Sequence, residues 1–306
     1  MRTVSVKTVP ADWVRKTASG VPLKVKLIQS DWYRYQQSIS RWVPTPEATY
    51  TPKSDWSGGS DYMSQKDAIH YSREGMPEMV PGIMSQLKAL TSESEAPAHA
   101  WVRAVDGYRR LNVDAYLSGN PMFASKRKLA PKKTESCRIV VQLDISACIT
   151  KDDMVKRGAC LMGLVMALQA RGVHTQVTIM SDAGAQDCHS PCEGFQLVDL
   201  DVDPMDVSVC AFVLSHPAFV RSVMWSVASR EGEGVNGSLW TSLIDRCGTM
   251  DNPAAVAKYI PRIRQVLELA ETDIYVPPFY GHDPMMADPI AWIAKMVDKV
   301  TLVEDE

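Results

Sequence analysis

The chain has no hydrophobic run long enough to cross a membrane as a helix. Its longest apolar runs, at 161–168 and 209–214, are far shorter than the roughly 20 residues that a spanning helix needs. Basic residues near the start are not followed by an apolar segment, so we expect no secretory signal. The sequence therefore predicts a cytoplasmic protein, or one in a particle assembled in a cytoplasm.

The chain also lacks a strong charge of either sign and a glycine-rich phosphate loop. A net charge of -3 over 306 residues is too small to attract a polyanion through bulk electrostatics. No glycine-rich loop follows a predicted strand, because Gly158 and Gly163 fall inside or at the edge of a predicted helix. No G-x-S-x-G motif stands in a recognisable context either. These absences argue against a nucleotide-driven enzyme and against a serine hydrolase.

The cysteines do not indicate a disulfide framework. Their number, seven, is odd, and the sequence around Cys160 and Cys210 is apolar. Cysteines in such surroundings act as small buried hydrophobic residues. We expect reduced thiols, which agrees with a reducing compartment.

Three regions of the chain differ in composition. Residues 1–60 mix aromatic and basic side chains with prolines and glycines, and we expect an irregular, partly helical region there. Residues 61–136 predict a small helical region, with helices before Gly75 and at 81–90, and then a basic linker. From 137 to 306 the pattern changes to alternating strands and helices.

The last region predicts an α/β domain with a three-layer, Rossmann-like arrangement. The run RIVVQL at 138–143 is β-branched and continuous, as in a strand buried on both faces. A helix follows at 152–171, with Thr150 and Asp153 spaced as a capping box and Gly172 at its end. Further strands are expected at 173–180, 195–200 and 273–276, and further helices at 204–230, 254–270 and 289–299. This alternation predicts a mainly parallel sheet with helices on both faces.

The loop after the first strand of this domain carries a candidate pair of metal ligands. Ligands of open parallel sheets bind beyond the carboxyl ends of the strands. Asp144 and Ser146 stand two residues apart there, and hard oxygen ligands of this kind suit Mg²⁺. Asp182 and Asp199 lie near the ends of the next two predicted strands and are further candidates by position alone.

The strand, the loop DISAC and the helix RGACLMGLVMALQARG together resemble the start of a von Willebrand factor A (vWA) domain. The metal-ion-dependent adhesion site of that family carries Asp-x-Ser-x-Ser on this loop, so Asp144 and Ser146 match its first two ligands. Cys148 stands where a serine is expected, and a neutral thiol is a poor ligand for Mg²⁺. The resemblance implies a degenerate adhesion site, which would bind an acidic group of a partner protein through the metal.

Further segments extend the similarity beyond this domain: DAIHYSREGMPEMV, LNVDAYLSGNPM and SHPAFVRSVMWSVASREGEG. Together they resemble a family of tailed-phage and prophage proteins that carry a vWA-like domain at the C-terminal end. The resemblance covers about residues 61–233 and implies a phage context, in the host cytoplasm or in a virion, but no particular activity. Proteins of this kind often act beside an AAA-type ATPase or inside an assembled particle. We therefore expect a non-enzymatic protein-interaction module.

Two other functions are left open by the sequence. The aromatic and basic N-terminal half would suit single-stranded DNA or RNA, because aromatic rings stack on bases and cations contact phosphate. A metal-dependent enzyme would use Asp144 with Asp182 or Asp199 around Mg²⁺, but no convincing base or nucleophile accompanies them. The cations of the nucleic-acid alternative are Lys126, Arg127, Lys128, Lys132 and Lys133.

Overall fold

A computed structural model describes most of the sheet and the helices packed on it. The described residues are 3–9, 23–41, 65–92, 110–111, 124–125, 136–144, 149–182, 192–200, 202, 205–224, 227, 253–278 and 284–301. The strands are β1 (Thr3–Val9), β2 (Leu23–Asp31), β3 (Arg110–Leu111), β4 (Ala124–Ser125), β5 (Ser136–Gln142), β6 (His174–Asp182), β7 (Cys192–Leu200) and β8 (Ile274–Val276).

The α-helices are α1 (Trp32–Arg41), α2 (Gln65–Glu74), α3 (Val80–Ser92), α5 (Lys151–Arg171), α6 (Val207–Ser215), α8 (Pro253–Val266), α9 (Pro284–Ala287) and α10 (Pro289–Thr301). A 3-10 turn (Pro77–Met79) precedes α3, and a π-helix (Phe219–Met224) follows α6. None of the described helices is both long enough and apolar enough to cross a membrane.

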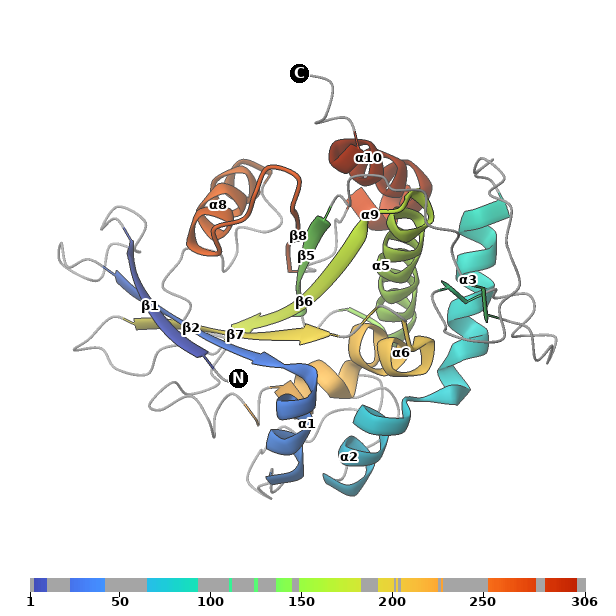
Figure 1. Ribbon diagram of the computed structural model, residues 1–306, viewed down its shortest axis with the longest axis horizontal. Coiled ribbons are helices and arrows are strands. Elements are labelled where there is room, and N and C mark those ends of the chain that lie inside the picture. Colours follow the sequence, from blue (N-terminus) through green and yellow to red (C-terminus); the bar gives the residue numbers. More distant parts are fainter. Residues whose placement is uncertain are drawn as a thin grey trace.

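A six-stranded sheet in the order β1-β2-β7-β6-β5-β8 organises the molecule (Figure 1). Strands β6, β5 and β8 are parallel to one another, and β2 is parallel to β7. The pairs β6–β7 and β1–β2 are antiparallel. The expected α/β class with a mostly parallel sheet is therefore confirmed, although the sheet is mixed. The direction of β7 has a simple cause, because residues 183–191 are too few for the crossover of a dozen or more residues that a parallel neighbour requires.

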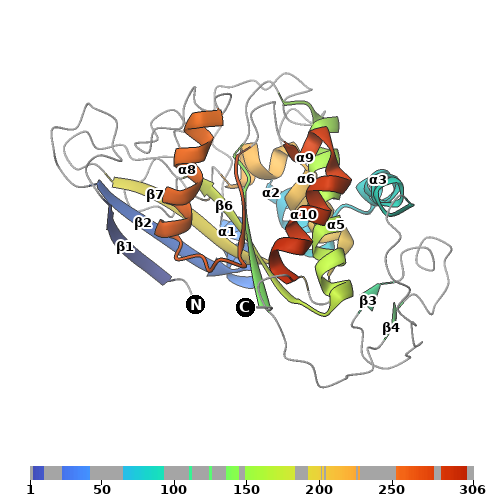
Figure 2. The ribbon, with the colours of Figure 1, turned by 90° about the horizontal axis from the view of Figure 1, so that it is seen from above.

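Apolar side chains cover both faces of this sheet and form two cores. Figure 2 shows α8 on the opposite side of the sheet from α5 and α10. On one face Tyr259, Ile263 and Val266 of α8 pack on side chains of β2, β5, β6 and β7. On the other face α1, α5, α6 and α10 share the larger core. The free thiols of Cys137, Cys160 and Cys210 are buried, as the sequence predicts for the latter two.

Helix α5 follows the sequence prediction closely. The Thr150 Oγ1 accepts a hydrogen bond from the backbone N–H of Asp153 at 3.2 Å, and the Asp153 carboxylate accepts one in return from the Thr150 N–H. The helix ends at Gly172, which adopts the left-handed conformation with φ of 91°. Its central turns are buried, which explains why the sequence is apolar almost all round.

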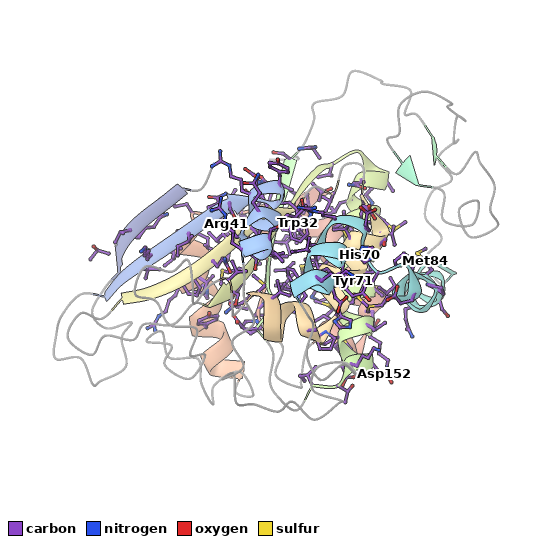
Figure 3. All side chains as sticks on the ribbon, turned by 90° about the horizontal axis from the view of Figure 1, so that it is seen from below. Trp32, Arg41, His70, Tyr71, Met84 and Asp152 are labelled. Carbon is purple, nitrogen blue, oxygen red and sulfur yellow. The ribbon has the colours of Figure 1, made fainter. Side chains whose placement is uncertain are left out.

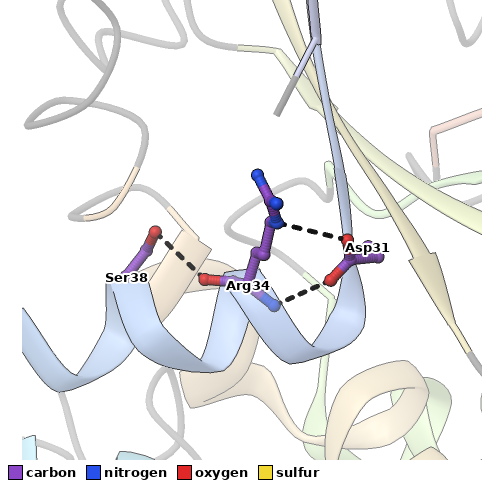
Figure 4. Close-up of polar contacts among 3 residues, drawn as sticks. All are labelled: Asp31, Arg34 and Ser38. Atoms are coloured by element: carbon purple, nitrogen blue, oxygen red, sulfur yellow. Dashed lines mark hydrogen bonds and ion pairs between the residues drawn. The ribbon is translucent and has the colours of Figure 1, made fainter. Parts of the chain in front are cut away.

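The N-terminal region is more regular than its composition suggests, because β1, β2 and α1 all lie within residues 1–60. In LKVKLIQSD the buried Val25 and Leu27 alternate with lysines, a strand pattern that the neighbouring prolines and glycines obscured. Asp31 caps α1 by accepting from the Arg34 N–H at 2.9 Å, and its carboxylate also pairs with the Arg34 guanidinium (Figure 4).

Helices α1, α2 and α3 lie in a row beside α6 and α5, as Trp32, His70 and Met84 mark in Figure 3. The α2 helix stops before Gly75, as predicted, and this glycine has φ of 72°. A Cβ there would lie 2.0 Å from the Ser208 Oγ of α6, so this junction needs glycine. Residues of all three predicted regions thus contribute to one packed core.

Candidate functional site

The carboxyl ends of β5, β6 and β8 meet at one edge of the sheet, and Asp144 lies there. The chain leaves β5 through α5 to reach β6 on one side, and later returns to β8 on the other side of β5. The strand order therefore reverses at β5. In open α/β sheets such a switch point is where ligands bind.

The Asp144 side chain is almost completely buried, with 1% of its surface exposed. Its Oδ2 accepts a hydrogen bond from Gln142 Nε2 at 2.7 Å, and its Oδ1 accepts one from Ser181 Oγ at 3.1 Å. An isolated buried carboxylate is costly, and donors of this kind offset part of that cost. Each carboxylate oxygen has two lone pairs and can accept more than one hydrogen bond.

Gln142 is the last residue of β5 and connects Asp144 with two tyrosines. Its Oε1 accepts hydrogen bonds from the Tyr259 hydroxyl of α8, at 3.1 Å, and from the Tyr275 hydroxyl of β8. An ionised carboxylate can only accept, so the amide NH₂ must face Asp144 and the amide oxygen must face the tyrosines. Both phenols then donate to Gln142, and Gln142 donates to Asp144, so all three hydrogen bonds run in the direction of Asp144.

A buried arginine holds the same edge of the sheet together. Arg157 of α5 is 2% exposed, and its Nη2 donates to the backbone oxygens of Gln142, at 3.2 Å, and Pro277, at 2.8 Å. These bonds join the carboxyl ends of β5 and β8. They also place a buried positive charge at the backbone of Gln142, two residues before Asp144.

Gln196 of β7 brings a further polar group to this edge. It lies directly opposite Ser181 in the ladder, so the two side chains share one face of the sheet with their Cβ atoms roughly 5 Å apart. Gln196 is 3% exposed, and no donor among the described residues reaches its Oε1. A buried amide oxygen without a partner is costly, so this position favours a ligand that supplies a donor or a cation.

His216 is buried near the start of α5, at the C-terminal end of α6. Burial, with a smaller contribution from the charge of Lys151, lowers the pKa of its imidazole to about 4. The Nδ1 atom accepts a hydrogen bond from the Ala218 N–H at 3.2 Å. The imidazole is therefore neutral at pH 7, with its proton on Nε2.

The structure separates two of the predicted ligands. Asp199 lies opposite Thr178 of β6, three residues before Ser181, which is roughly 10 Å along the strand. It accepts hydrogen bonds from Gln29 Nε2 at 2.9 Å and from Thr178 Oγ1 at 2.6 Å. Because β7 runs antiparallel to β6, Asp199 lies toward the opposite edge from Asp144.

The other predicted residues are described in part or not at all. Asp182 ends β6 at the same edge as Asp144, but only its backbone is described. Ser146 and Cys148 lie outside the described residues, as do the cations Lys126, Arg127, Lys128, Lys132 and Lys133. Within the described part of the chain, no three His, Cys, Asp or Glu side chains gather as a metal site would require.

Sequence reasoning missed the polar residues that surround Asp144 and Gln142. Gln142 is a polar residue at the end of a β-branched run, and Arg157 is a cation within a mainly apolar helix. Polar residues inside elements that are otherwise buried need partners, so these interruptions were an available signal. The tyrosines gave no such signal, because Gln142 and Tyr259 are 117 positions apart.

Comparison with known proteins places the chain in a family without giving it a function. The family model described as Domain of unknown function (DUF7192) matches residues 29–302. No curated protein and no solved structure matches the chain. The match begins within β2, so β1 and most of β2 lie outside it.

Proposed function

The chain belongs to the DUF7192 family, and from the geometry around Asp144 we propose that it is a protein-interaction module. Its binding face is the edge of the sheet at the carboxyl ends of β5, β6 and β8. The buried Asp144 carboxylate carries this proposal, because a charge is held there by dedicated donors at a switch point. An apolar residue would stabilise the fold more simply, so the charge indicates a role in binding.

We further propose that residues from 137 onward form a vWA-like domain with a three-layer, Rossmann-like arrangement. Asp144 follows the first strand of this region and precedes α5, as the resemblance to that family requires. Helices on both faces of the sheet support the same assignment. The phage context stays a proposal of the same kind, based on the sequence alone.

The polar groups at this edge fit a hydrated magnesium ion. They supply the carboxylate of Asp144, the hydroxyl of Ser181 and the Gln196 Oε1 that lacks a donor among the described residues. Mg²⁺ prefers oxygen ligands and keeps several waters, so it needs few protein groups. Asp144 would hold the ion, with Ser181 and Gln196 orienting its waters. The bound ion would supply a positive centre for an acidic side chain of the partner.

The proposed partner is a protein with an exposed carboxylate. In a phage context such a partner would be an AAA-type ATPase or a component of an assembled particle. This interaction requires no chemical step, so Asp144 is assigned a binding role only.

Thermal unfolding with added Mg²⁺ or Mn²⁺ tests the proposal. An ion present at 100 times its dissociation constant stabilises the native state by about 2.7 kcal/mol, which raises the melting temperature by roughly 5 °C for a chain of this size. We expect this shift for the wild type and none for Asp144→Ala.

The Asp199→Ala variant is a matched control, because Asp199 also accepts from one glutamine amide and one hydroxyl. It should keep the full shift. If neither ion raises the melting temperature of the wild type, or if Asp144→Ala responds equally, the metal site is wrong. Partner capture from infected cells then tests the face itself, and Asp144→Ala should lose the partners that Asp199→Ala retains.

A further inference from the structure

A chain of hydrogen bonds connects Asp144 with helix α8, which covers the smaller core on one face of the sheet. The Tyr259 hydroxyl donates to Gln142 Oε1, and Gln142 Nε2 donates to Asp144 Oδ2. We infer that Tyr259 and Tyr275 are positioning residues for Asp144, and that the first half of α8 responds to what Asp144 binds. This inference rests on the proposed function in one respect, since it takes Asp144 as the binding group.

The residues of this chain of hydrogen bonds are buried and therefore shielded from water. Gln142 is completely buried, Tyr259 is 1% exposed and Tyr275 is 8% exposed. Water therefore has little access to these groups, so solvent does not replace a hydrogen bond that is lost between them. The single amide of Gln142 serves both ends, because its oxygen takes the two phenols and its nitrogen serves the carboxylate. Loss of the hydrogen bond to Asp144 therefore weakens the hydrogen bonds from the two tyrosines, and the reverse also holds.

Helix α8 is built so that its two halves can respond separately. Pro261 lies inside the helix, two residues after Tyr259, and cannot donate a backbone hydrogen bond to the preceding turn. Beyond the proline, Ile263 and Val266 pack on the sheet, and Arg264 Nη1 donates to the Asp273 backbone oxygen at 2.8 Å. The second half is therefore attached independently of Tyr259, and Pro261 is the hinge between the halves.

A ligand that competes for Oδ2 of Asp144 leaves the Gln142 amide without its acceptor. The amide then turns, the two phenols lose their shared acceptor, and the first half of α8 is held less firmly. Coupling of binding free energies is reciprocal, so removing a phenol must also change the affinity at Asp144. The loss of one buried hydrogen bond corresponds to a change of about fivefold to tenfold.

Hydrogen exchange of the full-length protein, followed by mass spectrometry, tests the coupling without any ligand. Asp144→Ala removes the acceptor of Gln142, and we expect exchange in residues 253–260 to accelerate at least about fivefold. Ser181→Ala removes another donor to Asp144 and leaves the hydrogen bonds of Gln142 in place, so exchange in residues 253–260 should stay at the wild-type rate. Equal rates in wild type and Asp144→Ala, or equal acceleration in both variants, would overturn the inference.

Tyr259→Phe is a second variant, in case Asp144→Ala does not fold. It removes one oxygen and should accelerate exchange in the peptide containing Gln142 and Asp144, whereas Tyr71→Phe, on α2, should not. If Tyr259→Phe leaves that peptide unchanged, the coupling is absent.

Titration of the same variants with Mn²⁺ separates the coupling from the proposed function. We expect Tyr259→Phe and Tyr275→Phe to change the Mn²⁺ affinity about fivefold, with Tyr71→Phe matching the wild type. Binding that is equal in all four proteins would contradict the coupling while supporting the metal site. No uptake by the wild type would contradict the metal site, and the exchange rates would still decide the coupling.

Discussion

At the scale of single residues, His216 makes the stability of the protein depend on pH. Its pKa is lowered from 6.5 to about 4 in the folded chain, mainly by burial. Between these values the unfolded chain binds one more proton than the folded chain, so acidification favours unfolding. The stabilisation is complete above pH 6.5 and is lost as the pH falls toward 4. The expected loss from pH 7 to pH 5 is about 2 kcal/mol.

The test of this prediction is urea unfolding at both pH values. In His216→Asn the amide oxygen can still accept from the Ala218 N–H, but the side chain no longer titrates. The variant should lose about 2 kcal/mol less than the wild type over this range. If both proteins lose the same free energy, His216 does not carry the effect.

The residues around Asp144 show how far a sequence can specify a site. Asp144 was predicted as a metal ligand because it follows a recognisable buried strand, and that role stays a prediction. Ser181 was not, since a serine at a strand end has many possible uses. The contribution of Tyr259 depends on how α8 crosses the sheet, and no local pattern encodes that placement. A carboxylate after a strand can thus be identified from the sequence, whereas its hydrogen-bond donors from other elements cannot.

At the scale of elements, the contact between α5 and α6 depends on Gly158. A Cβ at this position would lie 1.8 Å from Ser215 Oγ and 3.1 Å from the Leu214 backbone oxygen. Alanine normally stabilises a helix relative to glycine by about 1 kcal/mol. Here the close approach of α6 outweighs that gain, and we expect Gly158→Ala to lower the free energy of unfolding by about 2 kcal/mol.

Chemical denaturation checks this prediction, with Gly82→Ala as the matched control. Gly82 lies in α3, and a Cβ added there would meet no neighbouring group within 4 Å, so alanine should stabilise the protein by about 0.5–1 kcal/mol. Adding Ser215→Gly to Gly158→Ala should cost less than the two single changes together. A gain of stability in Gly158→Ala alone would show that α6 can move away.

The elements of the C-terminal region were predicted well from the sequence, and their directions less well. Helix α5 was predicted with its cap and its terminal glycine, because both signals are local. The direction of β7 depends on the length of the connection before it, which the alternation of strands and helices does not reveal. Strand β2 was missed because its partner β7 is distant in the sequence, so only its own weak alternation marks it.

At the scale of the whole molecule, the two N-terminal strands contribute unequally to stability. Described side chains of β1 are exposed or half-buried, whereas Val25, Leu27 and Ile28 of β2 are buried. Deleting residues 1–9 removes the β1–β2 ladder of hydrogen bonds and the ion pair between Lys7 and Glu268. We expect the free energy of unfolding to fall by about 2–4 kcal/mol and the protein to stay folded. Because β2 then becomes the edge strand, self-association should increase.

Deleting residues 1–31 is the contrasting variant. Each large apolar side chain of β2 contributes about 1.5–3 kcal/mol through burial, so their combined loss approaches the stability of a whole domain. Circular dichroism should show a folded chain for the first deletion and an unfolded one for the second. Light scattering would detect the self-association. If the two deletions had equal effects, β1 and β2 would not differ in their contribution to stability as we expect.

Because β2 pairs with β7, it cannot join the sheet until much of the chain has been synthesised. Lys24 pairs with Cys192, so 168 positions separate the two partners in the chain. At roughly 5–20 residues per second, a ribosome needs on the order of ten to thirty seconds to make that length. During this interval β1 can form a hairpin with β2, but the apolar face of β2 has no sheet to join. Chaperones that recognise exposed apolar strands are therefore expected to bind the nascent chain at this hairpin during that interval.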